Sequence, residues 1–144
     1  MRIFEKLQPL SLLALRLALG LIFFYHGYEK LIRNSTDALA AFAGLGLPQY
    51  VFYVVGTLEL FGAILLAMGL LTRLTALLLA IEMGLVLARV DLPRGGMYAV
   101  HNYELPLALC VGAFVLATTG AGLLSLDAAT FERGAKSRPK AKSS

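Results

Sequence analysis

The chain of 144 residues contains no tryptophan and a single cysteine, Cys110. One cysteine excludes a disulfide framework and a C-x-x-C pair within the chain, so a redox role cannot depend on an intramolecular dithiol. Charged residues are also scarce, at 15% of the chain, whereas 58% of the residues are hydrophobic. A soluble domain usually has about 45–50% apolar residues, so this composition excludes an ordinary water-soluble domain.

Long apolar segments account for this excess. They cover roughly residues 10–31, 50–71, 73–90 and 105–124. Runs of about 18 or more apolar residues with few charges are typical of membrane-spanning helices. We therefore predict an all-α membrane protein, in which residues 1–127 form a four-transmembrane-helix bundle. The first segment continues apolar to Phe24 and is interrupted by Arg16, which favours a retained span over a cleaved signal peptide.

Helix-capping and helix-terminating residues predict where these helices begin and end. Pro9 is expected to start span one, and Gly69 to end span two. Thr72 and Asn102 are expected to cap spans three and four. Span four then extends to residue 124.

The longest connection, residues 34–49, has a helical pattern of its own. Leu39 and Phe42 are three residues apart, and Gly46 and Pro48 interrupt the pattern that they begin. We predict a short amphipathic helix in the membrane interface between spans one and two, with a partly ordered loop as the alternative.

Basic residues are unevenly distributed along the chain, whose net charge is +4. Five of the 13 Lys and Arg residues lie in the last 12 positions, so residues 128–144 are predicted to be a basic, disordered tail. Four spans put both termini on one side, with eight basic residues there and four on the other. The positive-inside rule then predicts cytoplasmic termini. Such a tail favours an anionic lipid surface as its partner, not a nucleic acid.

Polar groups concentrate in the outer half of the predicted bundle. The candidate pocket consists of Tyr25, His26, Lys30, Glu59 and Glu104. A surrounding structural polar cluster consists of Glu29, Glu82, Arg89, His101 and Asn102. A charge at the bilayer centre costs about 2.5–3.5 kcal/mol on insertion scales. Glu59 and Glu82 are therefore expected to face the bundle interior, where each pairs with a base or is protonated.

Spacing predicts which of these groups meet. His26 and Lys30 are one helical turn apart and are expected to face Glu59 and Glu104. Small residues on spans one and two favour close approach of the two helices: Gly27, Gly56 and Gly62. Glu29 points to a neighbouring face, where it is expected to meet Arg33 or Arg89.

Two interpretations of the polar groups remain open. They form either a buried ion-pair network that sets helix register or a pocket that binds a small amphipathic molecule or relays protons. The tyrosines at the same depth are typical of an aromatic belt. The two histidines have no H-x-x-x-H spacing or carboxylate-bridged partner, so no metal or haem site is predicted.

Several sequence motifs, taken in their order along the chain, resemble those of a known family. The first is R-L-x-L-G-L-I-F-F-Y-H-G-Y-E-K-L, starting at Arg16, and the second is E-L-F-G-A-I-L-L-A-M-G-L-L-T-R, starting at Glu59. Residues 102–104 (N-Y-E) enter span four, and G-A-G-L-L-S-L-D at 120–127 follows it. Together these motifs resemble the DoxX family of small bacterial membrane proteins.

This resemblance implies a four-helix protein of the bacterial inner membrane. The family takes its name from a subunit linked to thiosulfate:quinone oxidoreductase, other members are associated with redox-stress complexes, and a related eukaryotic branch includes receptor-assembly chaperones. The architecture also resembles that of quinone-dependent thiol oxidoreductases, but their cysteine pairs are absent here. Glu82 and Arg89 do not match positions of the family pattern, so their roles depend on burial arguments alone.

The leading hypothesis is an accessory or quinone-interacting subunit of a membrane redox system, with a quinone at the candidate pocket. No flavin, haem or nicotinamide motif is visible, so electrons would come from a redox partner protein, soluble or in the membrane. Independent catalysis is not claimed, and no catalytic residue is assigned. The alternatives are a non-catalytic membrane binding or assembly protein and a small-solute or proton pathway. Association with a second copy of the chain is compatible with each of them.

Overall fold

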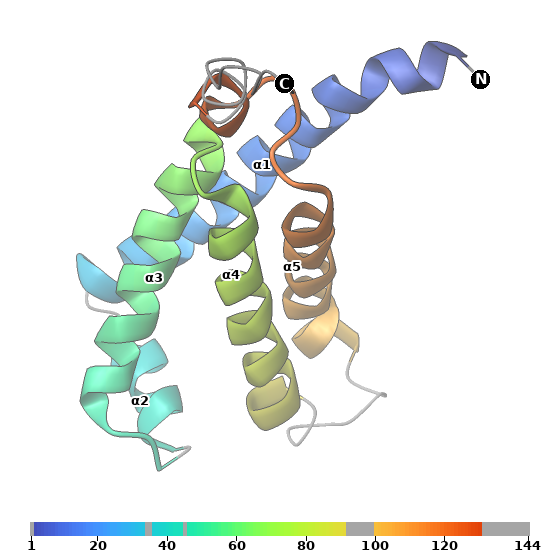
Figure 1. Cartoon of the computed structure of the whole chain (residues 1–144). Coiled ribbons are helices and arrows are strands. Elements are labelled where there is room, and N and C mark those ends of the chain that lie inside the picture. Colours follow the sequence, from blue (N-terminus) through green and yellow to red (C-terminus); the bar gives the residue numbers. More distant parts are fainter. Residues whose placement is uncertain (1, 34–35, 45, 92–99, 131–144) are drawn as a thin grey trace, which may run out of the picture.

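The computed structural model describes residues 2–33, 36–44, 46–91 and 100–130 of the chain. Every regular element within these ranges is a helix (Figure 1). The elements follow in the order α1 (Arg2–Leu31), α2 (Thr36–Ala43), α3 (Gln49–Met68), α4 (Thr72–Val86), the π-helical η1 (Leu87–Asp91) and α5 (Val100–Thr119). A further helical turn covers residues 126–130. The predicted all-α architecture is confirmed, as is a short helix between the first two long helices.

Two helices in the described part of the chain are long and apolar enough to cross a membrane, judged by length and composition. They are Lys6–Leu31 of α1 and Gln49–Met68, which is α3. Tyr103–Thr119 of α5 is a shorter apolar helix. All three segments are rich in leucine and alanine, which have high helix propensity.

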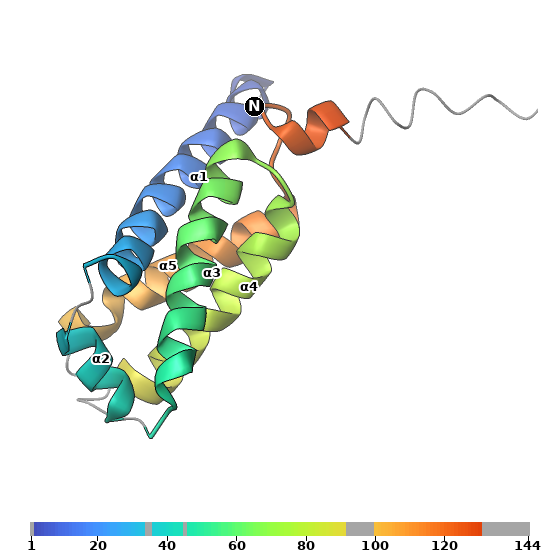
Figure 2. The same cartoon turned by 90° about the vertical axis from the view of Figure 1, so that its left-hand side faces the viewer.

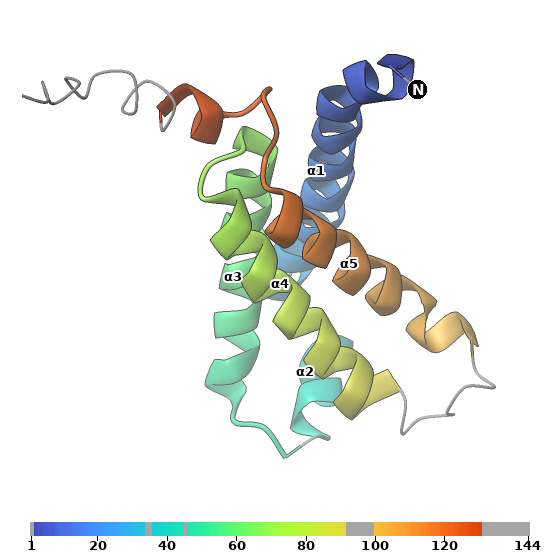
Figure 3. The same ribbon diagram turned by 45° about the vertical axis from the view of Figure 1, so that its right-hand side comes forward.

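The long helices pack in pairs. α1 lies mainly against α3, and α4 lies mainly against α5 (Figures 2 and 3). α3 and α4 form an antiparallel hairpin, and their turn lies at the same end of the bundle as the N-terminus and residues 120–130 (Figure 1). We call this the hairpin end. The opposite end holds α2, the end of α1, the start of α3 and η1, and we call it the α2 end.

Apolar side chains from all four long helices form the core. Its buried members are Leu19, Phe23, Ala63, Leu66, Ala76, Leu79, Ala80, Met83, Leu109, Ala113 and Leu116. Large apolar residues also cover the outward faces: Leu21 is 71% exposed and Phe61 is 60% exposed. Extensive exposed apolar surface of this kind is typical of helices that face lipid.

Glycine allows α1 and α3 to approach closely. A Cβ atom at Gly27 would lie 2.5 Å from the backbone nitrogen of Leu60 and 2.8 Å from the carbonyl oxygen of Gly56. Real Cβ atoms do not approach backbone this closely, so only glycine fits at this crossing. The predicted role of Gly27 in helix approach is therefore present in the structure.

Several predicted helix ends are wrong. α1 begins at Arg2, and Pro9 lies inside it. α5 begins at Val100, so Asn102 lies within the helix and is not its cap. α5 ends at Thr119 and not near residue 124, because Gly120 (φ 82°) adopts the left-handed conformation. Local patterns identified these helices correctly but placed their ends less well.

The α3–α4 turn is held by a residue distant in sequence. Gly69 ends α3 in the left-handed conformation, as predicted, but Leu71 and not Thr72 is the N-cap of α4. The backbone nitrogens of Leu71 and Thr72 donate to Oδ1 and Oδ2 of Asp127, at 2.8 and 2.9 Å. The Asp127 amide in turn donates to the Gly69 carbonyl oxygen at 2.9 Å. Asp127 thus supplies the cap that was expected from Thr72.

Arg16 joins α1 to the same end of the bundle. Its side chain is 1% exposed, and Nη2 donates to the Leu124 carbonyl oxygen. A side chain at position 69 would meet its guanidinium, so Gly69 is required here for space as well as for conformation. We call Arg16, Gly69, Leu124 and Asp127 the hairpin clamp. Residues 128–130, at the start of the predicted tail, are helical, and residues 131–144 lie outside the described part of the chain.

Candidate functional site: a buried charged group beside an apolar cavity

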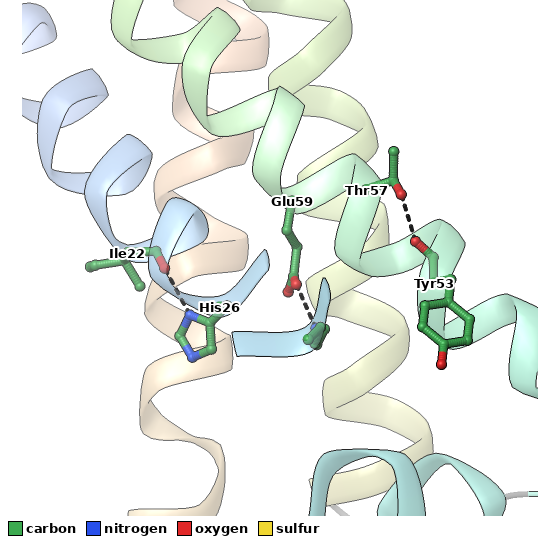
Figure 4. Close-up of polar contacts among 6 residues, drawn as sticks. Ile22, His26, Tyr53, Thr57 and Glu59 are labelled. Carbon is green, nitrogen blue, oxygen red and sulfur yellow. Dashed lines mark hydrogen bonds and ion pairs between the residues drawn. The ribbon is translucent and has the colours of Figure 1, made fainter. Parts of the chain in front are cut away.

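A buried ion pair joins α1 and α3 at the α2 end. Lys30 Nζ lies 2.6 Å from Glu59 Oε2, and the two side chains are 13% and 1% exposed. Figure 4 shows Glu59 extending from α3 toward the last turns of α1. The predicted contact between Lys30 and Glu59 is thus present. It depends on the close approach at Gly27 and on Gly56, where a Cβ atom would lie 3.0 Å from that of Lys30.

A second carboxylate, from α4, lies next to this pair. Glu82 is 7% exposed and interacts electrostatically with both Glu59 and Lys30. Neither of its oxygens has a hydrogen-bond partner among the described residues, and Glu59 Oε1 also lacks one. Two carboxylates therefore share a single ammonium in an apolar environment. We call Lys30, Glu59 and Glu82 the buried triad.

An apolar cavity of about 300 Å³ reaches Glu82 from the side of α2. Its lining residues come from α2, the loop after it, α3, α4 and η1: Phe42, Leu47, Val51, Val55, Glu82, Leu85, Val86 and Arg89. We call it the outer cavity. Glu82 is its buried polar group, and Arg89 is exposed. The two side chains line the same cavity, although they lie seven residues apart on α4 and η1.

Two local features shape this site. The helical hydrogen-bonding pattern widens to a π-helix over Leu87–Asp91, directly after α4. π-Helical turns are rare and occur frequently at functional sites. Phe42 of α2 lies between the cavity and the ion pair: it lines the cavity, and Lys30 Nζ lies 5.9 Å from the centre of its ring. Its aromatic face therefore offers Lys30 a cation–π contact.

Other members of the predicted pocket lie elsewhere. Tyr25 is 58% exposed, and Glu104 is exposed on α5. His26 is half-buried, with Nδ1 2.9 Å from the Ile22 carbonyl oxygen of its own helix (Figure 4). The buried triad therefore forms around Lys30 and Glu59 with Glu82 as its third member, where the prediction had His26 and Glu104.

The residues of the predicted structural polar cluster also do not all lie together in the structure. Glu29 Oε1 lies 2.7 Å from Arg33 Nη1, which is one of the two partners predicted for it. The hydrogen bond and the negative charge of Glu29 raise the pKa of this exposed arginine. The side chains of His101 and Asn102 lie outside the described part of the structure. Within that part, no group of three or more His, Cys, Asp or Glu side chains is arranged to hold a metal ion.

The cavity walls were not recognised from the sequence, although weak signals exist. Val51 and Val55 precede Glu59 by two turns and one turn on α3. Leu85 and Val86 follow Glu82 at i+3 and i+4, on the same helix face. Such patterns are common in apolar helices, so they do not distinguish a cavity wall from a packed core.

Comparisons with known proteins identify one family model and several similar proteins. The family model for DoxX matches residues 11–91. A protein of Bacillus subtilis named "Putative oxidoreductase CatD" is 31% identical over 130 residues, which cover 89% of this chain and 92% of that protein. An uncharacterized membrane protein of Mycobacterium tuberculosis is 30% identical over 138 residues, covering 88% of this chain and 85% of the other.

An uncharacterized protein of Haemophilus influenzae is 28% identical over 132 residues, with 90% of this chain and 97% of the other covered. No solved structure gives a significant match. The family match includes α1, α3, α4 and η1, the elements that supply the buried triad and Arg89. The chain belongs to the DoxX family of membrane proteins.

Proposed function

We propose that this protein is a quinone-interacting accessory subunit of a membrane redox system and that the quinone head enters the outer cavity. The observation that carries the proposal is the juxtaposition of the buried triad with an apolar cavity of about 300 Å³. Apolar walls with a few convergent polar groups are typical of small-molecule sites. A relative named as an oxidoreductase supports a redox context.

The chemistry of the lining residues fits a quinone. Apolar side chains on three elements would pack against the ring, and polar groups stand at two places along the cavity. Glu82 lies on α4, and Arg89 lies seven residues later in the π-helical turns of η1. A quinone has carbonyl oxygens on opposite sides of its ring, so Arg89 would donate to one and a protonated Glu82 to the other. Electrons would come from a partner protein.

In this proposal four helices cross the bacterial inner membrane. α4 with η1 and α5 would complete the bundle that α1 and α3 begin, since Thr72–Asp91 and Val100–Thr119 are each 20 residues long. A helix of 20 residues is about 30 Å long, which matches the hydrocarbon core. The hairpin end, which carries the start of α1 and residues 120–130 (Figure 1), would face the cytoplasm.

Cysteine labelling tests this topology. In a Cys110→Ala background, Arg33→Cys at the α2 end should react with an impermeant maleimide added to intact cells. Thr130→Cys at the hairpin end should react only after lysis. Both native residues are exposed, so burial does not explain a difference. The reverse pattern would place the outer cavity on the cytoplasmic side and contradict the proposed topology.

A binding measurement tests the ligand. Purified protein in detergent should change the absorbance spectrum of a short-chain benzoquinone as the two are titrated together. Val55→Phe, which fills the cavity, should abolish this change. Val54→Phe is the matched control, because Val54 is adjacent in sequence but 61% exposed. Equal binding by both variants would show that the quinone lies elsewhere. The absence of any saturable binding would favour the binding or assembly role.

A further inference from the structure

We propose that Glu59 and Glu82 together hold one proton in the resting protein and that Glu82 presents this proton to the outer cavity. The inference deepens the proposed function, because it identifies the hydrogen-bonding group that a cavity ligand would meet. It has its own basis in the charge balance of the buried triad and in the position of Glu82 on the cavity wall.

The charge balance requires the proton. Lys30 and Glu59 neutralise each other at 2.6 Å, so an ionised Glu82 would leave one uncompensated negative charge. An isolated charge in an apolar environment is costly, and the group is neutralised instead. A proton bound between the two carboxylates removes that charge. The proton also supplies a hydrogen-bond donor to a group of oxygens that lack one. Both oxygens of Glu82 and Oε1 of Glu59 have no partner among the described residues.

Neighbouring charges do not remove this requirement. The described part of α2 contributes the apolar Phe42 to this site. From α5, the thiol of Cys110 contacts α4 and donates to the Ala80 carbonyl oxygen at 3.3 Å. Arg89 lines the same cavity, but neither oxygen of Glu82 has a hydrogen-bond partner among the described residues, so Arg89 does not pair with it. Among the described residues, Lys30 is therefore the buried cation that lies beside the two carboxylates.

The cavity decides which carboxylate presents the proton. Glu82 lines the outer cavity, whereas Glu59 is fully buried between Lys30 and the helices and does not line it. A ligand in the cavity thus meets the Glu82 carboxyl group first. The class of ligand that fits is a largely apolar molecule with a hydrogen-bond acceptor at its inner end, such as a ring carbonyl.

Infrared spectroscopy of the purified full chain tests the shared proton. At neutral pH the wild type should show a carboxylic-acid C=O band that shifts in D2O. Glu82→Gln and Glu59→Gln should each abolish it, because either change leaves one carboxylate balanced by Lys30. Lys30→Met should enlarge the band about twofold, because two carboxylates then lack a cation. Glu29→Gln, at a carboxylate that is already paired with Arg33, should leave it unchanged.

Carbodiimide labelling tests which group faces the cavity. Dicyclohexylcarbodiimide is apolar and reacts with protonated carboxyl groups: the acid proton moves to a carbodiimide nitrogen while the carboxyl oxygen bonds to the central carbon. Mass spectrometry should locate the adduct on Glu82. Val55→Phe should reduce labelling at least tenfold, and Val54→Phe should not. Glu82→Gln should remove it.

Each outcome decides the inference. A missing band in the wild type, or a band retained in both glutamine variants, overturns the shared proton. Labelling of Glu59 in place of Glu82, or no labelling, overturns the role of Glu82 at the cavity. Neither readout uses a quinone, so a failure of quinone binding would overturn the proposed function without overturning this inference.

Discussion

The two ends of the bundle use buried charge differently. At the hairpin end, charged side chains bind backbone groups: Asp127 accepts from two amides of the α3–α4 turn, and Arg16 donates to a carbonyl oxygen. At the α2 end, charged side chains bind one another, and three carboxylate oxygens have no partner among the described residues. The first arrangement joins loops, although Arg16 Nε and Nη1 also have no partner among the described residues. The second leaves the unpaired oxygens of Glu82 at the wall of a cavity.

A cavity alone does not distinguish the two ends. A cavity of about 420 Å³ also lies at the hairpin end, where Asp127 is one of its lining residues. Both oxygens of that carboxylate are already occupied by the amides of Leu71 and Thr72. At the α2 end, Glu82 lines the cavity with both oxygens open. The comparison shows that a ligand site needs an accessible polar group whose hydrogen bonds are not already made.

The largest expected effect comes from breaking the ion pair. Lys30→Met leaves the buried Glu59 without its cation, and the loss of one member of a buried pair typically costs about 3–5 kcal/mol. Lys30→Met combined with Glu59→Gln removes both charges and should recover most of that loss. Thermal unfolding in detergent measures both variants. Additive losses in the double variant would show that the two side chains are not energetically coupled.

A smaller effect should come from separating α1 and α3. Gly27→Ala places a methyl group against the backbone of Leu60, and overpacking of this kind typically costs about 1–3 kcal/mol. It should also weaken the contact between Lys30 and Glu59. Gly84→Ala is the control, because a Cβ atom there would meet only Cys110 Sγ, at 3.8 Å. Equal melting temperatures for the two variants would show that the helices separate without cost.

The sequence predicted the contacts that depend on periodicity. Lys30 meets Glu59 because both are charged, lie at similar depth on apolar helices and have glycine beside them. Sequence alone places Glu82 in the structural cluster, because only the packing of α4 brings its helix face to Glu59. Glu104 was placed in the pocket because of its depth alone, but it is exposed on α5.

The hairpin clamp shows what local sequence cannot predict. Thr72 is a good capping residue in the right place, yet Asp127, 55 residues later, makes the cap. Tertiary contacts override such local preferences, and a single sequence does not contain the pairing of distant loops. The family motifs at Arg16, Gly69 and Asp127 gain a physical reason only when the structure brings them together.

The clamp itself offers a test of the comparison. Asp127→Ala removes two backbone hydrogen bonds, and loss of an N-cap side chain typically costs about 0.5–2 kcal/mol. Because the clamp lies at the opposite end from the outer cavity, quinone binding and carbodiimide labelling of Glu82 should not change. Asp127→Asn, which keeps one acceptor oxygen, should lose less stability. A change in labelling with either variant would show that the two ends are coupled.

The smallest effect is expected at the exposed ion pair of the α2 end. Glu29 and Arg33 are as close as Lys30 and Glu59, at 2.7 against 2.6 Å, but the Arg33 side chain is 69% exposed. Water and salt screen such pairs, so Glu29→Gln should leave the melting temperature unchanged at physiological salt. Glu29 raises the pKa of Arg33. The small contribution of this ion pair to stability is therefore fully present at neutral pH and is lost only as the pH rises above the normal arginine range. Because Arg33 stays charged throughout the neutral range, the melting temperatures of Glu29→Gln and the wild type should stay equal there. A salt titration completes the measurement: if Glu29→Gln destabilises the protein as much as Lys30→Met, then burial is not what separates the two ion pairs.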